Sequence, residues 1–277
     1  MKALTLDDFF AALWADYVRT APHVAGLRAA IEARGETVVN DHVAFRTFAG
    51  RPIGIDALEP HLKLLGYRRF EAYTFEDKHL DAWAYLHPAP TAPRIFLSEL
   101  RRGSLSAAAE AIIDGLLAEV DASLVLHPEV MWAGPLWSPI AFGDYERLAA
   151  ESEYAAWVAA LGLRANHFTV SVNHLNNGLG LDGLLEVVEA AGGVIATAGG
   201  RIKGSGIALL EQASTLADVQ PVCFADGEIH PIPTCYYEFA RRYPDASGGL
   251  YQGFVPASAN RLFEATHRGG RAPSGTT

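Results

Sequence analysis

Two short hydrophobic stretches that each contain a histidine constrain this sequence more than any other feature. Residues 40–48 read NDHVAFRTF, and residues 166–172, more than a hundred positions later, read NHFTVSV. Successive side chains of a strand point to opposite faces, so His42, Ala44 and Arg46 are predicted to share one face of the first stretch. The opposite, mostly apolar face would carry Asp41, Val43, Phe45 and Thr47.

An imidazole and a guanidinium on the same strand face suit a metal ligand beside a receptor for a carboxylate. A single histidine of this kind is more simply explained as a polar residue at the edge of an ordinary sheet. The second stretch changes this assessment, because it repeats the Asn-(x)-His opening on the same kind of strand. We therefore interpret the two stretches as equivalent strands of an internal repeat.

Each stretch opens a similar series of predicted elements. The first series has a strand at 40–48, a helix at 56–65, and strands at 67–73, 80–87 and 94–100. The second has a strand at 166–172, a helix at 180–191, and strand-like runs at 194–196, 207–212, 221–225 and 234–241. Each series begins with a histidine and ends with a glutamate on its last strand, Glu99 or Glu238.

These patterns predict an α+β fold. Two tandem strand–helix–strands modules would form a curved sheet around a central metal cavity, with N-terminal helices and a helical insert. The predicted boundaries are about 36–102 for module one, 103–162 for the insert, which contains helices at 104–119 and 144–161, and 163–242 for module two. A C-terminal segment at 243–268, with a short helix at 259–265, would complete a single catalytic domain of residues 1–268, followed by a disordered tail at 269–277.

Composition limits the class of partner. The net charge of −10 argues against a nucleic-acid-binding protein, which usually presents a basic face. No uninterrupted apolar run approaches the ~20 residues of a membrane span. The first residues lead directly into Asp7 and Asp8, unlike a signal peptide, and Cys223 and Cys235 are expected to be thiols, so we expect a cytoplasmic protein.

Two imidazoles and one carboxylate on neighbouring strands would form the facial set of ligands used by non-haem Fe(II) enzymes, which leaves positions open for substrate and dioxygen. Zinc accepts the same ligands. His42 and His167 would supply the imidazoles, and either Glu99 or Glu238 the carboxylate. The residues alone do not separate the two glutamates, because both lie in apolar strands and either could form a buried ion pair with an arginine instead.

Four segments in order are more specific than either histidine alone. They are residues 40–48, FLSEL at 96–100, AW at 156–157 followed by NHFT at 166–169, and YEFAR at 237–241. Together they resemble the 2-oxoadipate dioxygenase/decarboxylase family, whose fold is similar to that of the vicinal oxygen chelate enzymes. The resemblance extends from about residue 5 to residue 268.

This resemblance implies an Fe(II) centre whose ligands are His42, His167 and Glu238, with Glu99 as a non-ligating counterpart. It also implies that Arg46 binds a carboxylate of the substrate, for which the planar guanidinium is well suited. The implied reaction is the oxidative decarboxylation of 2-oxoadipate by O2, followed by hydroxylation of the shortened acid. Its products would be 2-hydroxyglutarate and CO2, a step of lysine degradation.

The chain is shorter than well-known members of that family, whose additional segments help to shape the substrate pocket. Candidates for closing the pocket here are Lys203, Ser205, Gln212, Ser214 and residues 253–255. Two alternative functions remain: another metal-dependent enzyme of the same fold that acts on a different oxo acid, and a metal-free protein that binds a small molecule. The paired histidines argue against the second, since a simple binding cavity needs no matched imidazoles.

Overall fold

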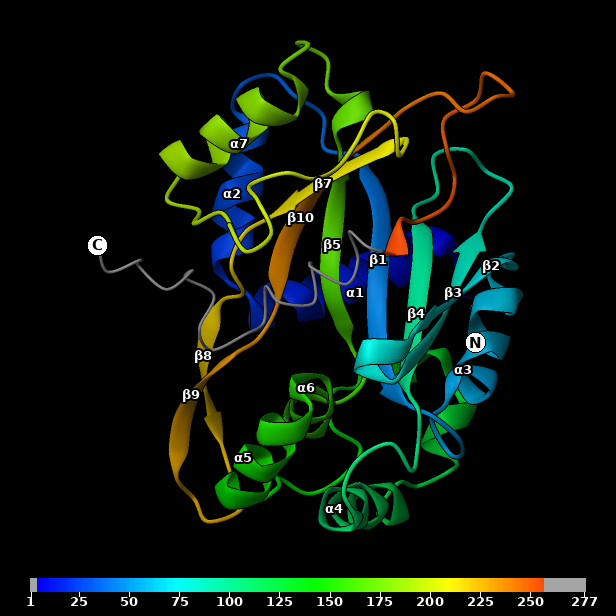
Figure 1. Cartoon of the computed structure of the whole chain (residues 1–277), viewed down its shortest axis with the longest axis vertical. Helices are drawn as coiled ribbons and strands as arrows, with labels where there is room; N and C mark the ends of the chain where they lie inside the picture. Colours follow the sequence, from blue (N-terminus) through cyan, green and yellow to red (C-terminus); the bar gives the residue numbers. More distant parts are fainter. Residues whose placement is uncertain (1–3, 257–277) are drawn as a thin grey trace.

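The computed structural model describes residues 4–256, and its centre is one curved sheet of eight strands (Figure 1). The strand order is β2-β3-β4-β1-β5-β10-β7-β6. The strands are β1 (Asn40–Phe48), β2 (Arg68–Phe75), β3 (Leu80–Leu86), β4 (Arg94–Leu100), β5 (Ala165–Ser171), β6 (Lys203–Ser205), β7 (Leu210–Ser214) and β10 (Tyr236–Arg242). The predicted α+β fold with a curved sheet is confirmed.

The two histidine strands lie side by side at the middle of the sheet. β1 pairs with β5 in the antiparallel direction, while β1 with β4 and β5 with β10 are parallel pairs. All strands on the β4 side of this junction come from the first repeat, and all strands on the β10 side come from the second. The first strands of the two repeats, β1 and β5, are therefore neighbours, and the last strands, β4 and β10, flank them.

Two β-bulges interrupt the pairing of β1 with β5. Asn40 pairs with Val170 and His42 with Thr169, so Asp41 is an extra residue on β1. Ala44 pairs with His167 and Phe45 with Ala165, so residue 166 is an extra residue on β5. Each extra residue directly precedes one of the two histidines.

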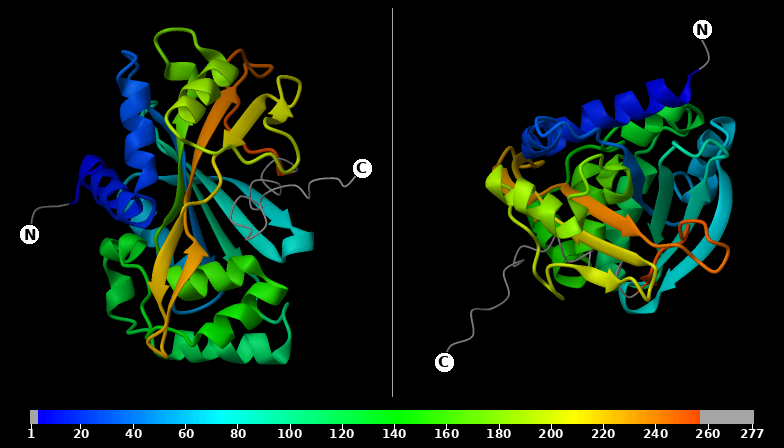
Figure 2. Two further views of the ribbon diagram at one scale, coloured as in Figure 1. Left: turned by 90° about the vertical axis from the view of Figure 1, so that its left-hand side faces the viewer. Right: turned by 90° about the horizontal axis from the view of Figure 1, so that it is seen from above.

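The N-terminal helices α1 (Leu6–Thr20) and α2 (His23–Glu32) and the later helix α7 (Gly180–Ala190) pack against one another and on the sheet (Figure 2). A capping box between Thr5 and Asp8 starts α1. Trp14 and Tyr17 of α1 then contact Phe168 of β5, which leaves the neighbouring His167 on the other side of that strand. Helix α3 (Ile55–Leu64) contacts β4.

The helical segment between the repeats gathers at one end of the sheet (Figure 1). It contains α4 (Ala107–Ala118), α5 (Phe142–Glu151) and α6 (Glu153–Leu161). The prediction of one continuous helix at 144–161 was wrong, because Ser152 adopts an extended conformation that ends α5. Its side chain accepts a hydrogen bond from the Ala155 amide and so caps the start of α6.

The second repeat departs most from the predicted elements. Residues 194–196 are not a strand, since Ile195 makes only an isolated bridge to Thr215. The run at 221–225 corresponds to β8 (Val219–Cys223), which pairs with β9 (Ile229–Pro233) in a separate hairpin. Both strands of this hairpin contain proline, which has no backbone N–H and therefore cannot donate a hydrogen bond within a central sheet. The predicted helix at 259–265 and the tail at 269–277 lie outside the described residues.

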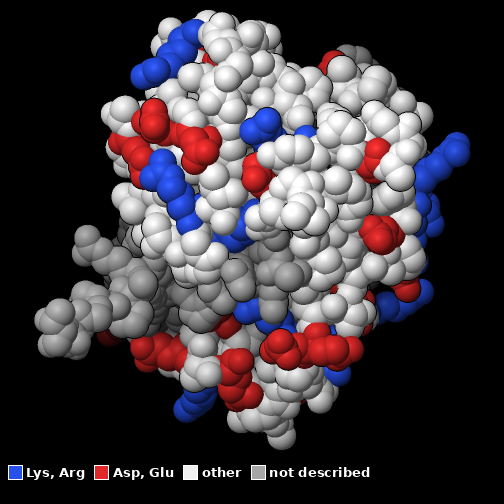
Figure 3. All heavy atoms as spheres, turned by 45° about the horizontal axis from the view of Figure 1, so that its top comes forward, with Lys and Arg blue, Asp and Glu red and all other residues white. Residues whose placement is uncertain are grey.

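Acidic and basic side chains are interspersed on the face of the molecule shown in Figure 3. Within residues 4–256, no helix combines the length and the apolar composition needed to cross a bilayer.

Candidate metal centre

The structure brings His42 of β1, His167 of β5 and Glu238 of β10 together on three adjacent strands. Their potential ligand atoms lie within 4.8 Å of one another. The two Nε2 atoms are 3.4 Å apart, and the Glu238 carboxylate lies 3.4 Å from Nε2 of His42 and 3.5 Å from Nε2 of His167. All three side chains are buried.

The extra residue of each bulge orients the histidine that follows it. Nδ1 of His42 is 2.9 Å from Oδ2 of Asp41, and Nδ1 of His167 is 3.0 Å from Oδ1 of Asn166. Both oxygens act as acceptors, so the proton of each neutral imidazole is placed on Nδ1 and the lone pair on Nε2. Both lone pairs then face the cluster, where Nε2 of His42 also lies 3.1 Å from the hydroxyl of Thr169.

The alternation of side chains predicted that Asp41 would join the apolar face with Val43 and Phe45, and this was wrong. The bulge at Asp41 breaks the period of two and turns its carboxylate to His42 instead. Sequence reasoning also missed Asn166 as a partner of His167. The signal that could have found both is a polar residue directly before each histidine.

Electrostatics at the cluster favour a bound cation. Burial, together with nearby His42 and Arg46, lowers the pKa of His167 well below its ordinary value, so this imidazole is neutral at pH 7. Burial raises the pKa of Glu238, while His42 and a 2.7 Å hydrogen bond from Gln212 Nε2 to Oε1 oppose that shift. A buried carboxylate is costly unless a cation compensates it. Two imidazoles and one carboxylate match the ligands of a non-haem Fe(II) site.

The depressed pKa of His167 leads to a prediction for the metal-free protein. In the unfolded chain a histidine titrates near ~6.5. Below that pH the unfolded state binds a proton that the folded state does not, so the free energy of unfolding should decrease as pH falls through that range. His167→Gln, which cannot titrate, should show a shallower decrease of Tm between about pH 7.5 and about pH 5. Equal slopes for the two proteins would show that the folded imidazole takes up a proton normally.

The three residues open onto a narrow pocket of about 30 Å³. Its lining combines aromatic with polar side chains, and among the described residues Arg46 is the one arginine or lysine that contributes to it. The lining residues are His42, Ala44, Phe45, Arg46, Phe96, Ser98, Asn166, His167, Gln212, Tyr236, Glu238 and Phe254.

Arg46 is almost fully buried, with 2% of its surface exposed. Its guanidinium lies 5.3 Å from the ring centre of Tyr154 and 5.2 Å from that of Trp157, both on α6, and it hydrogen-bonds with Tyr236. Burial lowers its pKa from the ordinary value. Arg46 also lines a larger hollow of about 500 Å³ between the turn at 77–80 and the α5–α6 junction, so it lies between the narrow pocket and this hollow.

Asp41 and Glu99 have different partners. Asp41 binds Arg242 and Arg94, and the Glu99 carboxylate accepts a 2.7 Å hydrogen bond from the backbone N–H of Ile55 at the start of α3. Burial raises the pKa of Glu99, and this amide opposes the shift. Glu99 therefore lies in a different environment from Glu238 and does not line the pocket.

The other predicted pocket residues differ in position. Gln212 lines the pocket and holds Glu238. Lys203 donates to the carbonyl of residue 196, Ser205 accepts from the amide of residue 208, and Ser214 is buried opposite Glu238 in the register of β7 with β10. These last three residues do not line the pocket. In the 253–255 stretch, Phe254 does.

Comparison with known sequences decides the family. The sequence model of the 2-oxoadipate dioxygenase/decarboxylase family matches residues 9–131 and 129–251. The chain belongs to this family. A family member from Oryza sativa subsp. japonica, described as the chloroplastic/amyloplastic 2-oxoadipate dioxygenase/decarboxylase, is 32% identical over 260 residues, which cover 84% of this chain and 70% of that protein. This chain is thus a member of an enzyme family.

Two solved structures share the fold across nearly the whole chain. The hydroxyglutarate synthase from Oryza sativa in complex with 2-oxoadipate is 28% identical, with a TM-score of 0.88 and coverage of 94% of this chain and 91% of that one. A protein from Shewanella frigidimarina, described provisionally as a hydrolase, is 42% identical, with a TM-score of 0.87 and coverage of 92% and 99%.

Proposed function

We propose that this chain is an Fe(II)-dependent dioxygenase/decarboxylase that converts a 2-oxo diacid, 2-oxoadipate, and O2 into 2-hydroxyglutarate and CO2. The observation that carries the proposal is the buried cluster of His42, His167 and Glu238, which opens onto a pocket whose lining includes Arg46. Membership of the family and the 2-oxoadipate complex of the Oryza sativa relative support the choice of substrate. Lysine degradation is the pathway in which such a step would belong.

His42 and His167 would hold the metal through Nε2, because their Nδ1 atoms already face Asp41 and Asn166. Glu238 would supply the carboxylate, which the hydrogen bond from Gln212 to Oε1 orients. A ferrous ion bound there would supply the redox chemistry that joins dioxygen to the 2-oxo acid. The protein would supply neutral imidazoles, an ionised carboxylate and a cavity largely closed to water.

Arg46 would bind a substrate carboxylate. A guanidinium can donate two parallel hydrogen bonds to a carboxylate, which fixes the orientation of the acid as well as neutralising its charge. The rings of Tyr154 and Trp157 and the hydroxyl of Tyr236 would hold this guanidinium in place. Phe96 and Phe254 would cover the apolar chain of the substrate.

The pocket is smaller than a six-carbon diacid, so the substrate must displace side chains when it enters. Phe254 is the large lining residue best placed to move, because it belongs to an irregular segment that follows the last strand of the sheet.

The test is anaerobic purification, metal analysis, and reconstitution with Fe(II), followed by oxygen uptake with a panel of 2-oxo acids. We expect one O2 consumed for each CO2 released with 2-oxoadipate, and 2-hydroxyglutarate as the product. Slower uptake is expected with a 2-oxo monoacid of equal length. No oxygen uptake with any 2-oxo acid by the iron-loaded protein would exclude the proposal, and uptake only with a different oxo acid would change the substrate.

A further inference from the structure

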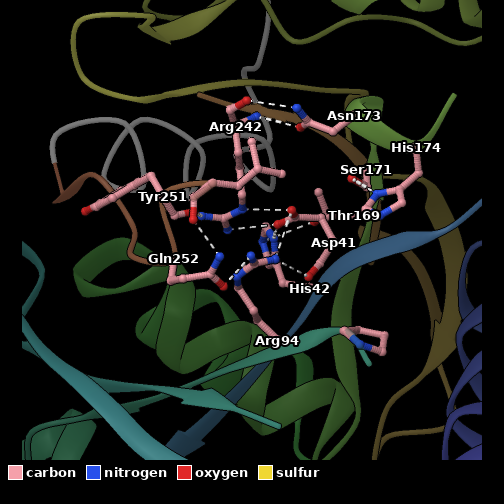
Figure 4. Close-up of polar contacts among 12 residues, drawn as sticks. Asp41, His42, Arg94, Thr169, Ser171, Asn173, His174, Arg242, Tyr251 and Gln252 are labelled. Carbon is pink, nitrogen blue, oxygen red and sulfur yellow. Dashed lines mark hydrogen bonds and ion pairs between the residues drawn. The ribbon is translucent and has the colours of Figure 1, made fainter. Parts of the chain in front are cut away.

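Asp41 lies at the centre of a buried polar cluster that extends well beyond His42 (Figure 4). Its carboxylate accepts from Nδ1 of His42 at 2.9 Å. Nε and Nη2 of Arg242 donate to the same group at 2.8 and 2.9 Å, and Nη1 of Arg94 is 3.2 Å away. One carboxylate thus joins a histidine of the metal centre to two arginines.

Both arginines also bind residues 251–254, called the closing segment here. Nη1 of Arg242 donates to the carbonyls of Tyr251 and Gly253 at 2.9 and 2.7 Å. Nη2 of Arg94 donates to the side-chain oxygen of Gln252 at 2.6 Å. Each arginine that binds Asp41 therefore also binds the closing segment.

The closing segment returns to the metal centre through Phe254. The ring of Phe254 lies 4.8 Å from that of His42 in an edge-to-face arrangement and lines the pocket. The guanidinium of Arg242 lies 5.3 Å from the same ring. His42, Asp41, Arg242 and Phe254 consequently form a closed ring of contacts.

The charges of this cluster favour its formation as a unit. Burial alone would raise the pKa of Asp41, but Arg242 and His42 hold it well below its ordinary value. Burial lowers the pKa of Arg94 to about 10, with Asp41 opposing that shift and Arg242 adding to it. Removal of the carboxylate would leave two guanidiniums facing each other without compensation, which is much more costly than loss of a neutral contact.

In the described part of the chain, no carboxylate faces Nδ1 of the second histidine, His167. His167 contacts the neutral amide of Asn166. The amide nitrogen of Asn166 makes no hydrogen bond within the described part of the chain. The two bulges are therefore geometrically similar but electrostatically different.

We propose that Asp41 is a positioning residue that couples metal binding at His42 to docking of the closing segment, through Arg242 and Arg94. The inference rests on the proposed function, because it takes His42 as a metal ligand. A carboxylate on Nδ1 fixes the ring and makes Nε2 a stronger ligand. Because coupling between two binding events is reciprocal, a docked segment should strengthen metal binding, and a bound metal should strengthen docking.

The experiment uses the full chain and Co(II), whose visible absorption reports its ligands. Co(II) affinity is measured by competition with a chelator, and docking by hydrogen exchange of the amides of residues 251–254 with and without Co(II). In the unmodified protein, Co(II) should slow this exchange. Asp41→Asn should lower Co(II) affinity about 10–100-fold, change the Co(II) spectrum and remove the protective effect on the closing segment.

Two further variants keep the test decisive if Asp41→Asn does not fold. Gln252→Ala touches neither the pocket nor Asp41, and it should speed exchange in the closing segment and lower Co(II) affinity severalfold. Arg102→Gln is the control for loss of an arginine–carboxylate network elsewhere, because Arg102 binds Glu110 and Asp114 outside the cluster. This control should match the unmodified protein in affinity, spectrum and exchange.

The outcomes separate the two proposals. Failure of the unmodified protein to bind Co(II) or Fe(II) would exclude the metal centre itself. Normal Co(II) affinity and normal protection of residues 251–254 in the variants, even with a lowered Tm, would overturn the coupling and leave the metal centre intact. Such a result would reduce Asp41 to a structural ion-pair partner.

Discussion

Replacement of His42, His167 or Glu238 by alanine is expected to abolish stoichiometric iron binding, and turnover with it. Each change removes one of the three ligands that residues 4–256 bring together at the cluster. The fold should persist, because each side chain faces the pocket while the apolar residues beside it pack on the other side of the sheet. Iron content after anaerobic reconstitution and desalting, together with far-ultraviolet circular dichroism, measures both effects.

Glu99→Ala is the matched control for Glu238→Ala. It removes a partly buried glutamate from the equivalent strand of the other repeat, where the carboxylate accepts from the amide of Ile55. We expect normal iron content and a loss of about 1–3 kcal/mol in the free energy of unfolding. Loss of iron from Glu99→Ala with retention in Glu238→Ala would reverse the assignment of the two repeats.

Arg46→Lys is expected to lower kcat/KM for 2-oxoadipate at least tenfold with iron content unchanged. Lysine keeps the charge but loses the planar pair of donors that matches a carboxylate. A charge-assisted hydrogen bond in a dry pocket is worth about 1.5–3 kcal/mol, which corresponds to roughly ten- to more than a hundredfold in rate. Arg46→Ala should lose more, since the charge is lost as well.

The activity of the Arg46 variants on two substrates, a 2-oxo monoacid and 2-oxoadipate, shows which carboxylate Arg46 binds. If it binds the distal carboxylate, activity on a 2-oxo monoacid should change less than activity on 2-oxoadipate. If it binds the carboxylate beside the oxo group, both should fall equally. A normal kcat/KM with a reduced Tm would instead mean that Arg46 only supports the packing of Tyr154 and Trp157.

The strands at 40–48 and 94–100 and the paired histidines were predictable because period and residue type are local properties. The contribution of Asp41 was not, because a bulge depends on how β1 and β5 pair, and these strands are far apart in the sequence. The choice between Glu99 and Glu238 depends similarly on register, since a shift of one residue reverses the face of a side chain. Arg242 and Phe254 belong to the site only through contacts between distant segments.

The two bulges have a consequence for how this centre can vary among related chains. From Asn40 to Phe45, β1 advances five residues, and from Val170 to Ala165, β5 does the same, so the two extra residues cancel. Loss of one would shift every later pair of the ladder and misplace a histidine. Loss of both would restore the ladder but leave each imidazole without its Nδ1 acceptor. Insertions at these two positions must therefore be inherited or deleted as a pair, which makes them a more demanding marker of this centre than the histidines themselves.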